Sequence, residues 1–288
     1  MFKLGAITDE ISQNFERAVD VCKEYDLQTV EIRSVWDKPS QDLTDTDVAA
    51  IQAVLSAKGL TVSCLASPFF KCDIDDEEAG KKHLDILRNC ARLARKLGTN
   101  LVRVFTFWNT GKTHEIWDRI LERYQEPIAI AEEEDVILAV ENEASTSIST
   151  ARLLEKFLRE IDSPRVRAVW DPGNEVHAPD GERPYPEAFD RVKDLMVHFH
   201  LKDVARDPQT GKPRAMPVGE GSIDYMGQLR ALLAMGYQGA VSLETHWRPK
   251  ELPKDMIDKP GGKEFSSEGE YASRVCLDNL LKIVRQIA

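Results

Sequence analysis

The sequence predicts an α/β protein, a single (β/α)8 TIM barrel over residues 1–288, and three observations support this fold class. Eight short runs rich in apolar and β-branched residues recur along the chain, as buried parallel strands require. Their starts lie between 27 residues (2 to 29) and 43 residues (196 to 239) apart, which leaves room for one crossover helix in each interval. The length of 288 residues also suits one barrel of this kind.

The expected strands follow one another without a Pro- or Ser-rich linker between them. They are FKLGAIT (2–8), TVEIR (29–33), TVSCLAS (61–67), NLVRVFT (100–106), VILAVEN (136–142), VRAVWD (166–171), MVHFHLKD (196–203) and GAVSLET (239–245). An open, doubly wound sheet is the alternative, but the turn after its first strand normally carries a glycine-rich motif. Here that turn reads TDEIS, which favours the barrel.

The intervening segments carry helix signals. Thr44 and Asp47 form a capping pattern before VAAIQAVL. Apolar residues after the fifth run are spaced as on one helix face: Leu154, Phe157, Leu158 and Ile161. Glycines stand just past three helical patterns, where a left-handed residue ends a helix: Gly59, Gly98 and Gly236. The segment 270–288 reads as an amphipathic helix that packs on the barrel or on a partner, so we expect either a monomer or a homo-oligomer.

Composition and charge exclude several classes of protein. Hydrophobic residues make up 42% and charged residues 30% of the chain, an ordinary balance for a globular protein. The net charge, 38 − 49 = −11, disfavours nucleic-acid binding. The sequence has neither a membrane-spanning apolar run nor a signal-peptide core, and its five cysteines are scattered, as a reducing compartment permits. We therefore expect a soluble, cytoplasmic protein.

Four successive strands end in charged or imidazole side chains, which a packed barrel core does not need. The strand ends are AVENE with Glu141 and Glu143, VWDPGN with Asp171, HFHLKD with His198, His200 and Lys202, and SLETHW with Ser242, Glu244 and His246. Parallel strands bring these groups to one rim, where buried carboxylates need a compensating cation. Three carboxylates and one imidazole suit Mn²⁺ or Mg²⁺, with Co²⁺ or Zn²⁺ as alternatives.

Each of these residues also has a purely structural interpretation. A single glutamate, Glu141 or Glu244, can serve as the ion-pair partner of Lys202, and Lys202 can pair with Asp203 instead. His198 lies deeper along its strand, where a hydrogen-bonded core histidine is expected. The coincidence of four strand ends favours a functional site.

At these residues the sequence resembles the xylose isomerase-like TIM-barrel superfamily of sugar isomerases and epimerases. The resemblance covers nearly the whole chain and is most specific in the segments VEN, WDPGN, HFHLKD, GEGSID and SLET. It implies one divalent metal ion bound by a four-residue set: Glu141, Asp171, His200 and Glu244. It also implies substrate-facing roles for Glu31 and Arg103, and a place for Glu220 in the loop after the seventh strand that closes over the substrate. The structural alternatives are an ion pair with Arg33 for Glu31 and a solvated turn for Glu220.

One position departs from the epimerase pattern. Many epimerases carry a histidine three residues after the metal-binding aspartate, where this chain has Asn174; His177 is near but off register. Asparagine donates a hydrogen bond but carries no titratable proton, so the exact substrate and reaction stay open.

The family's chemistry implies proton transfer next to a carbonyl group, through an enediolate that the ion neutralises. Glu141 and Glu244 are the expected acid–base pair, with Lys202 polarising a substrate oxygen. If the enolate expels a β-hydroxyl group, the same residues act as a dehydratase. A non-catalytic barrel is a further alternative, whereas an endonuclease IV-like phosphodiesterase needs more histidines than the six present.

The expected substrate is a small sugar or polyol. Tryptophans follow three of the strands and phenylalanines follow a fourth: Trp36, Trp108, Trp247, Phe69 and Phe70. We expect these aromatic side chains to line the mouth of the barrel and to pack against the faces of a sugar ring. His198, His246 and Asn174 are the remaining candidate substrate contacts. Lys71, Arg103, Arg248 and Lys250 offer positive charge, but the absence of a clear glycine-rich phosphate loop favours an unphosphorylated sugar, keto-sugar or inositol derivative.

Overall fold

Eight parallel strands close into a barrel in a computed structural model that describes residues 1–250 and 266–287. The order around the barrel is β1-β12-β9-β8-β7-β6-β5-β2. The strands are β1 (Lys3–Ile7), β2 (Thr29–Ile32), β5 (Thr61–Ala66), β6 (Leu101–Val104), β7 (Ile137–Glu141), β8 (Val166–Trp170), β9 (Met196–Leu201) and β12 (Ala240–Leu243). Each lies inside one predicted run, which confirms the barrel and excludes the open sheet.

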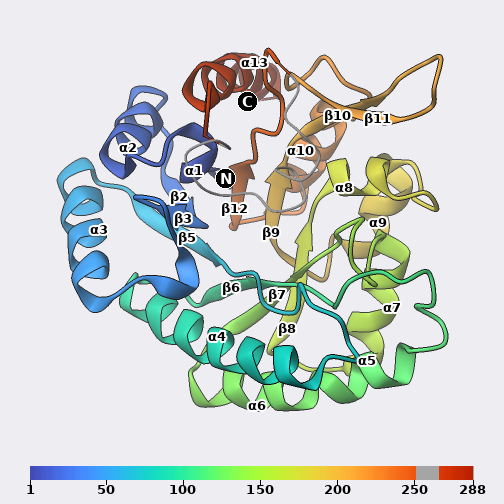
Figure 1. Ribbon diagram of the computed structural model, residues 1–288. Coiled ribbons are helices and arrows are strands. Elements are labelled where there is room, and N and C mark those ends of the chain that lie inside the picture. The colour runs from blue at the N-terminus through green and yellow to red at the C-terminus, as the bar shows by residue number, and fades with distance from the viewer. Residues whose placement is uncertain (251–265, 288) are drawn as a thin grey trace.

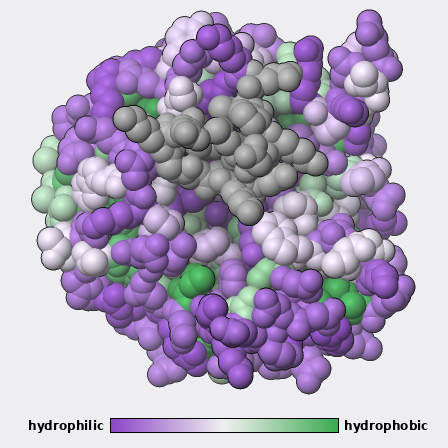
Figure 2. All heavy atoms as spheres, in the orientation of Figure 1, coloured by the Kyte–Doolittle hydropathy of each residue, from purple (hydrophilic) through white to green (hydrophobic). Residues whose placement is uncertain are grey.

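Helices surround the barrel and cover its outer face (Figure 1). They are α1 (Thr8–Ile11), α2 (Phe15–Glu24), α3 (Asp45–Lys58), α4 (Glu77–Lys96), α5 (Trp117–Arg123), α6 (Gln125–Glu133), α7 (Ala151–Ile161), α8 (Pro172–His177), α9 (Phe189–Val192), α10 (Tyr225–Ala234) and α13 (Gly269–Ile287), with helical turns η1 (Ser40–Asp42) and η2 (Pro184–Ala188). The molecular face in Figure 2 is largely hydrophilic, consistent with apolar side chains packed between helices and barrel. None of the described helices has the length and apolar character that a bilayer span needs.

The predicted local signals are confirmed. Thr44 and Asp47 form a reciprocal capping box at the start of α3, with the Asp47 amide donating to the Thr44 hydroxyl at 3.2 Å and the Thr44 amide donating to the Asp47 carboxylate at 2.8 Å. The three predicted glycines follow α3, α4 and α10 with positive φ angles: Gly59, Gly98 and Gly236. All five cysteines are buried and free.

The C-terminal helix α13 packs on the barrel's own helices, against α1 and α10 (Figure 1). Exposed ion pairs tie it to α2, such as Arg274 Nη2 to Glu24 Oε2 at 2.5 Å. The predicted last residue of this helix, Ala288, and the part of the predicted domain at 251–265 lie outside the described residues.

Two small hairpins are added at the carboxyl end of the barrel strands. β3 (Ser34–Val35) pairs with β4 (Lys38–Pro39) after β2, and β10 (Asp203–Arg206) pairs with β11 (Pro213–Met216) after β9. Strand β9 therefore ends at Leu201, and the predicted run 196–203 divides at Lys202, which stands between the barrel and the second hairpin. Asp203 holds the segment that follows this second hairpin, because its Oδ2 accepts from the amides of Gly219 at 2.8 Å and Gly221 at 3.0 Å.

Candidate metal and acid–base site

Four side chains from four neighbouring strands meet inside the carboxyl end of the barrel. Glu141 ends β7, Asp171 follows β8, His200 lies in β9 and Glu244 follows β12. All four are buried, and one potential ligand atom from each lies within 4.8 Å of the others. The strand order, which puts β12, β9, β8 and β7 side by side, explains why residues more than 100 positions apart converge.

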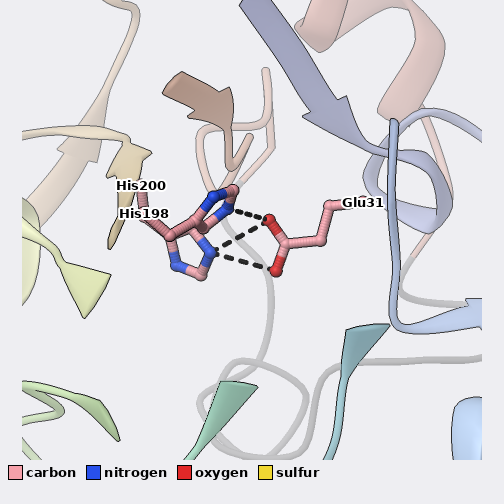
Figure 3. A group of neighbouring side chains, drawn as sticks. All are labelled: Glu31, His198 and His200. Atoms are coloured by element: carbon pink, nitrogen blue, oxygen red, sulfur yellow. Dashed lines mark hydrogen bonds and ion pairs between the residues drawn. The ribbon is translucent and has the colours of Figure 1, made fainter. Parts of the chain in front are cut away.

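The ring of His200 is oriented by contacts at both nitrogen atoms. Nδ1 lies 3.1 Å from Glu141 Oε1, 3.8 Å from Glu244 Oε2 and 4.0 Å from Asp171 Oδ2. Nε2 lies 3.1 Å from each carboxylate oxygen of Glu31 (Figure 3). A carboxylate only accepts hydrogen bonds, so Glu31 requires a proton on Nε2 and Glu141 requires one on Nδ1. Burial opposes the charge of this ring, but Glu31 and Glu141 outweigh it and hold the pKa of His200 well above its usual value. A metal ion would take the place of the Nδ1 proton, while Glu31 keeps the proton on Nε2.

Glu31 accepts from a second imidazole, because His198 Nε2 lies 2.7 Å from its Oε2 (Figure 3). The register between β2 and β5 shifts between Val30 and Glu31, an irregularity of the kind that re-aims side chains near active sites. Burial opposes ionisation of Glu31, but His200 and His198 outweigh it and hold the pKa of this carboxyl well below its usual value. Glu31 and His198 are fully buried and line neither cavity described below, so the structure places both behind His200.

Lys202 supplies positive charge on the opposite side of the carboxylates. Its Nζ lies 2.6 Å from Glu244 Oε2 and 2.7 Å from Asp171 Oδ2. Burial works against its charge, but these two carboxylates outweigh burial and hold the pKa of Lys202 well above its usual value. Burial, with the charges of Glu244 and Glu141, raises the pKa of Asp171 to about 8 despite the ammonium.

Glu141 is held by two further predicted residues. Arg103 Nη1 donates to its Oε2 at 2.8 Å, and Asn174 Nδ2 donates to its Oε1 at 3.1 Å. The backbone N–H of Asn174 donates to Asp171 Oδ1 at 2.9 Å. The residue that departs from the epimerase pattern therefore contacts two of the four members of the set, Glu141 through its side chain and Asp171 through its backbone. Burial opposes the charge of Glu141, yet His200 and Arg103 hold the pKa of this carboxyl below its usual value.

A buried ionic group beside Glu244 was not anticipated from the sequence. Arg33 donates from Nε to Asp9 Oδ2 at 3.0 Å and from Nη2 to Glu10 Oε1 at 2.6 Å, while its Nη1 lies 3.5 Å from Glu244 Oε1. His246 Nε2 lies 3.4 Å from the same Glu244 oxygen. The acidic residues of α1 follow β1 directly, so the strand-end pattern used for the later strands would have identified Asp9 and Glu10 as well.

Two adjoining cavities lie next to the four-residue set, and both are lined by Lys202 and His246, which contact Glu244. One of about 490 Å³ reaches Glu220, and one of about 540 Å³ reaches Asn174 and Glu143. They share four lining residues: His177, Lys202, Pro213 and His246. Glu143 pairs with Lys71 at 3.3 Å in the larger cavity. Burial, with Lys202 and His246 nearby, lowers the pKa of His177 to about 4 and keeps this imidazole neutral at pH 7.

The predicted aromatic walls divide into different environments. Trp247 lines the smaller cavity, and Trp108 lies beneath Lys71, whose Nζ is 5.8 Å from its ring. Trp36 packs edge-on against Phe15 and donates to Glu16 at 3.1 Å. Phe69 and Phe70 are buried and stack on each other, so their expected role as walls of the barrel mouth is wrong: the chain turns back after β5 and packs both rings into the core.

Comparisons with known proteins agree with this architecture. Residues 19–262 match the sequence model of the family described as xylose isomerase-like TIM barrel. An inosose dehydratase of Klebsiella pneumoniae (strain 342) is 26% identical over 152 residues, 48% of this chain and 50% of that protein, so the match spans about half the relative's length. A putative L-ribulose-5-phosphate 3-epimerase of Escherichia coli (strain K12) is 27% identical over 202 residues, 67% of this chain and 68% of that protein.

The same fold is present in a crystal structure of the IolI protein with a bound zinc atom. The two chains superpose with a TM-score of 0.77 at 19% identity, over 100% of this chain and 99% of that one. At this identity the superposition shows the fold.

Proposed function

The chain belongs to the xylose isomerase-like TIM barrel family, and from this premise we propose that it is a divalent-metal-dependent sugar isomerase or epimerase. The observation that carries the proposal is the convergence of three carboxylates and one imidazole at the carboxyl end of the barrel, with Lys202 beside them. The reaction is a proton transfer at the carbon next to a carbonyl group. The substrate is a small sugar or polyol, and the free thiols suit a cytoplasmic enzyme.

The donor set fits a divalent ion. Glu141, Asp171, His200 and Glu244 would hold it, and Glu31 would orient the imidazole from behind, an arrangement common around metal-binding histidines. The oxygen-rich set favours Mn²⁺ or Mg²⁺, while Co²⁺ or Zn²⁺ also suits it, and zinc is the ion named for the IolI protein. When bound, such an ion neutralises negative charge that develops on substrate oxygens.

The proton-transfer roles fall to Glu141 and Glu244. Glu141 ends β7 and Glu244 follows β12, so the two glutamates lie on either side of His200 in β9. A cation holds each of them in place, Arg103 for Glu141 and Lys202 for Glu244. Glu244 takes a proton from the carbon beside the substrate carbonyl, and the electron pair moves into the enediolate. Glu141 takes up a proton from solvent and delivers it to the other face or to the adjacent carbon, while Glu244 later releases its proton to solvent. Lys202 donates a hydrogen bond to the oxygen on which charge develops.

Dehydration is a second candidate reaction, favoured by the position of Lys202. The buried ammonium next to Glu244 can donate a hydrogen bond to a leaving hydroxyl group. The enolate electron pair then forms a carbon–carbon double bond as the β-carbon–oxygen bond breaks, and the hydroxyl leaves as water with the proton that Glu244 took from the neighbouring carbon. The name of the Klebsiella relative, an inosose dehydratase, supports testing this reaction.

Solvent-deuterium exchange tests the shared first step. The metal-loaded protein is incubated in D₂O with ketoses, keto-inositols and 3-keto-glycosides, and deuterium at carbon is followed by NMR. Exchange should appear on at least one compound and disappear in Glu244→Gln, while Glu78→Gln, an exposed glutamate on α4, should keep it. Exchange that persists in Glu244→Gln removes Glu244 from the role, and product analysis separates epimerisation from loss of water.

A further inference from the structure

An ion pair outside the four-residue set stands on the wall of the larger of the two cavities. Lys71 Nζ lies 3.3 Å from Glu143 Oε2, and the two side chains are only 14% and 19% exposed. Asn174 and Lys202, which contact the two acid–base glutamates, line the same cavity. The pair therefore borders the space next to the reacting groups but takes no part in the proposed proton transfer.

Aromatic rings hold the ammonium of Lys71, which lies in the segment after β5. Its Nζ is 4.3 Å from the ring centroid of Phe105 and 5.8 Å from that of Trp108, within the range of cation–π attraction. The guanidinium of Arg103 lies 4.3 Å from the same Phe105 ring and donates to Glu141. One buried ring thus positions both Lys71 and the cation that holds an acid–base residue.

The turn after β7 holds the carboxylate of Glu143. Its Oε1 accepts the backbone N–H of Ser145 at 3.1 Å, and its own N–H donates to the carbonyl of Ile148 at 3.1 Å. The Glu143 carbonyl accepts the hydroxyl of Thr146 at 3.0 Å. With Oε1 engaged by the turn, Oε2 is the oxygen that meets Lys71.

Both charged groups keep hydrogen-bonding capacity for a ligand. An ammonium has three N–H donors and each carboxylate oxygen has two lone pairs. Among residues 1–250 and 266–287, Lys71 Nζ and Glu143 Oε2 make one hydrogen bond each, to one another. A partly exposed ion pair of this kind adds little stability, so stability alone does not explain two fixed charges on a cavity wall.

We propose that Lys71 and Glu143 determine specificity by binding two adjacent hydroxyl groups on the part of the substrate that does not react. One hydroxyl donates to Glu143 Oε2 and its neighbour accepts from Lys71 Nζ. Hydroxyl oxygens on adjacent carbons lie about as far apart as two hydrogen-bonded atoms, about 3 Å, and Nζ and Oε2 are 3.3 Å apart. This inference rests on the proposed function for the presence of the substrate in this cavity, and it narrows the substrate to compounds with a vicinal diol.

Binding of two isomeric triols tests the inference without turnover, because neither has a carbonyl group. Cyclohexane-1,2,3-triol carries adjacent hydroxyls, whereas cyclohexane-1,3,5-triol carries them on alternate carbons, and NMR titration of the Mg²⁺-loaded protein gives both Kd values. The 1,2,3-triol should bind about tenfold more tightly, the contribution of one hydrogen bond to a charged group. Lys71→Met should lower this preference to about twofold, and Lys71→Arg, which keeps a donor, should retain it. Lys212→Met removes another lysine of the same cavity and should leave the preference unchanged.

The outcomes separate the inference from the proposed reaction. Equal binding of the two triols, or no binding of either, overturns the inference. A preference that survives in both Lys71→Met and the isosteric Glu143→Gln also overturns it, since the metal ion or Lys202 then recognises the diol. An equal loss in Lys212→Met overturns it in favour of the general charge of the cavity. A preference lost in Lys71→Met and kept in Lys71→Arg supports the inference even if no compound exchanges deuterium, a result that would contradict only the proposed reaction.

Discussion

Lys202 donates a hydrogen bond of 2.6 Å to the carboxylate of Glu244, with both side chains buried at the carboxyl end of the barrel. The ammonium thus contacts one of the carboxylates proposed to bind a divalent ion. In the metal-free protein it compensates part of the negative charge that the converging strands create. It also repels any second cation at that position, so Lys202 links the stability of the site to its affinity for metal.

Replacement of Lys202 by methionine should separate these effects. The metal-free variant should lose about 3–5 kcal/mol of stability, because removing one partner leaves buried carboxylates uncompensated. Its Kd for Mn²⁺ should fall at least about tenfold, because a competing charge less than 3 Å from two proposed ligand atoms is gone. Chemical denaturation and titration calorimetry measure the two quantities. Lys212→Met is the control, because Lys212 is an exposed lysine that lines the larger of the two cavities. Weaker Mn²⁺ binding in Lys202→Met than in the wild type would contradict the proposed competition between the ammonium and the ion.

Glu31→Gln tests whether Glu31 positions His200 or contacts substrate. A glutamine can turn its NH₂ group toward Nε2 and favour the tautomer with the proton on Nδ1, which cannot bind a metal ion. We expect the Kd for Mn²⁺ to rise about 10–100-fold and the ¹⁵N shifts of His200 to report the altered tautomer. His198→Gln retains a donor for Glu31 and should change the Kd much less. An unchanged Kd with a raised KM would instead return Glu31 to the substrate-contacting role expected from the sequence.

Glu175 should make stability depend on pH. Its Oε2 accepts the Ala151 amide at 2.7 Å, its Oε1 accepts the Glu182 amide at 2.8 Å, and burial raises its pKa from near 4.5 to about 7. The folded protein therefore binds this proton more tightly than the unfolded chain does. The resulting stabilisation is complete below about pH 4.5 and is lost as the pH rises to about 7.

Glu175→Gln removes this titration. The stability of the wild type relative to the variant should fall by about 1 kcal/mol per pH unit between pH 5 and 7 and level off above that range. Urea denaturation of both proteins in the presence of a chelator gives the difference at each pH. Parallel curves across the range would show that the carboxyl is ionised in the folded protein throughout.

Gly173 lies where α8 approaches Lys202 too closely for a larger residue. A Cβ atom at Gly173 would lie 2.6 Å from Lys202 Cγ and 2.9 Å from the Lys202 carbonyl oxygen. Gly173→Ala should cost about 1–3 kcal/mol of stability through this overpacking, and it should lower the rate of deuterium exchange by displacing the lysine. Gly80→Ala on α4 meets no atom within 4 Å and should stabilise the protein by about 0.5–1 kcal/mol. Thermal unfolding and the rate of deuterium exchange into substrate are measured for both variants. A Gly173→Ala protein that is destabilised but exchanges deuterium at the wild-type rate would show that Lys202 keeps its position.

Local patterns were sufficient to predict the barrel and the convergence of the four strand ends. Each apolar run has the composition of a buried strand, and the carboxyl ends of parallel barrel strands share one rim. Glu141, Asp171, His200 and Glu244 could therefore be predicted to meet, although they stand far apart in the chain. Their ligand roles, by contrast, came from the family resemblance and remain a proposal.

The partners of individual side chains were less predictable. Glu31 was expected to face substrate, with Arg33 as its alternative ion-pair partner. In the structure Glu31 contacts His198 and His200, while Arg33 turns toward Asp9, Glu10 and Glu244. Residues 31 and 33 would share a face of one strand, but β2 ends at Ile32, so Arg33 follows the strand and its side chain takes a different direction.

The sequence by itself determined the fold class, the rim at which polar side chains gather and the acid-rich character of the site, because these depend on periodicity and on strand order. Only the tertiary structure decided that Lys202 bridges Asp171 and Glu244 and that Phe69 and Phe70 pack inward. These relationships depend on how loops from different strands fold back over the barrel. Such contacts join residues distant in sequence, and no local pattern records them.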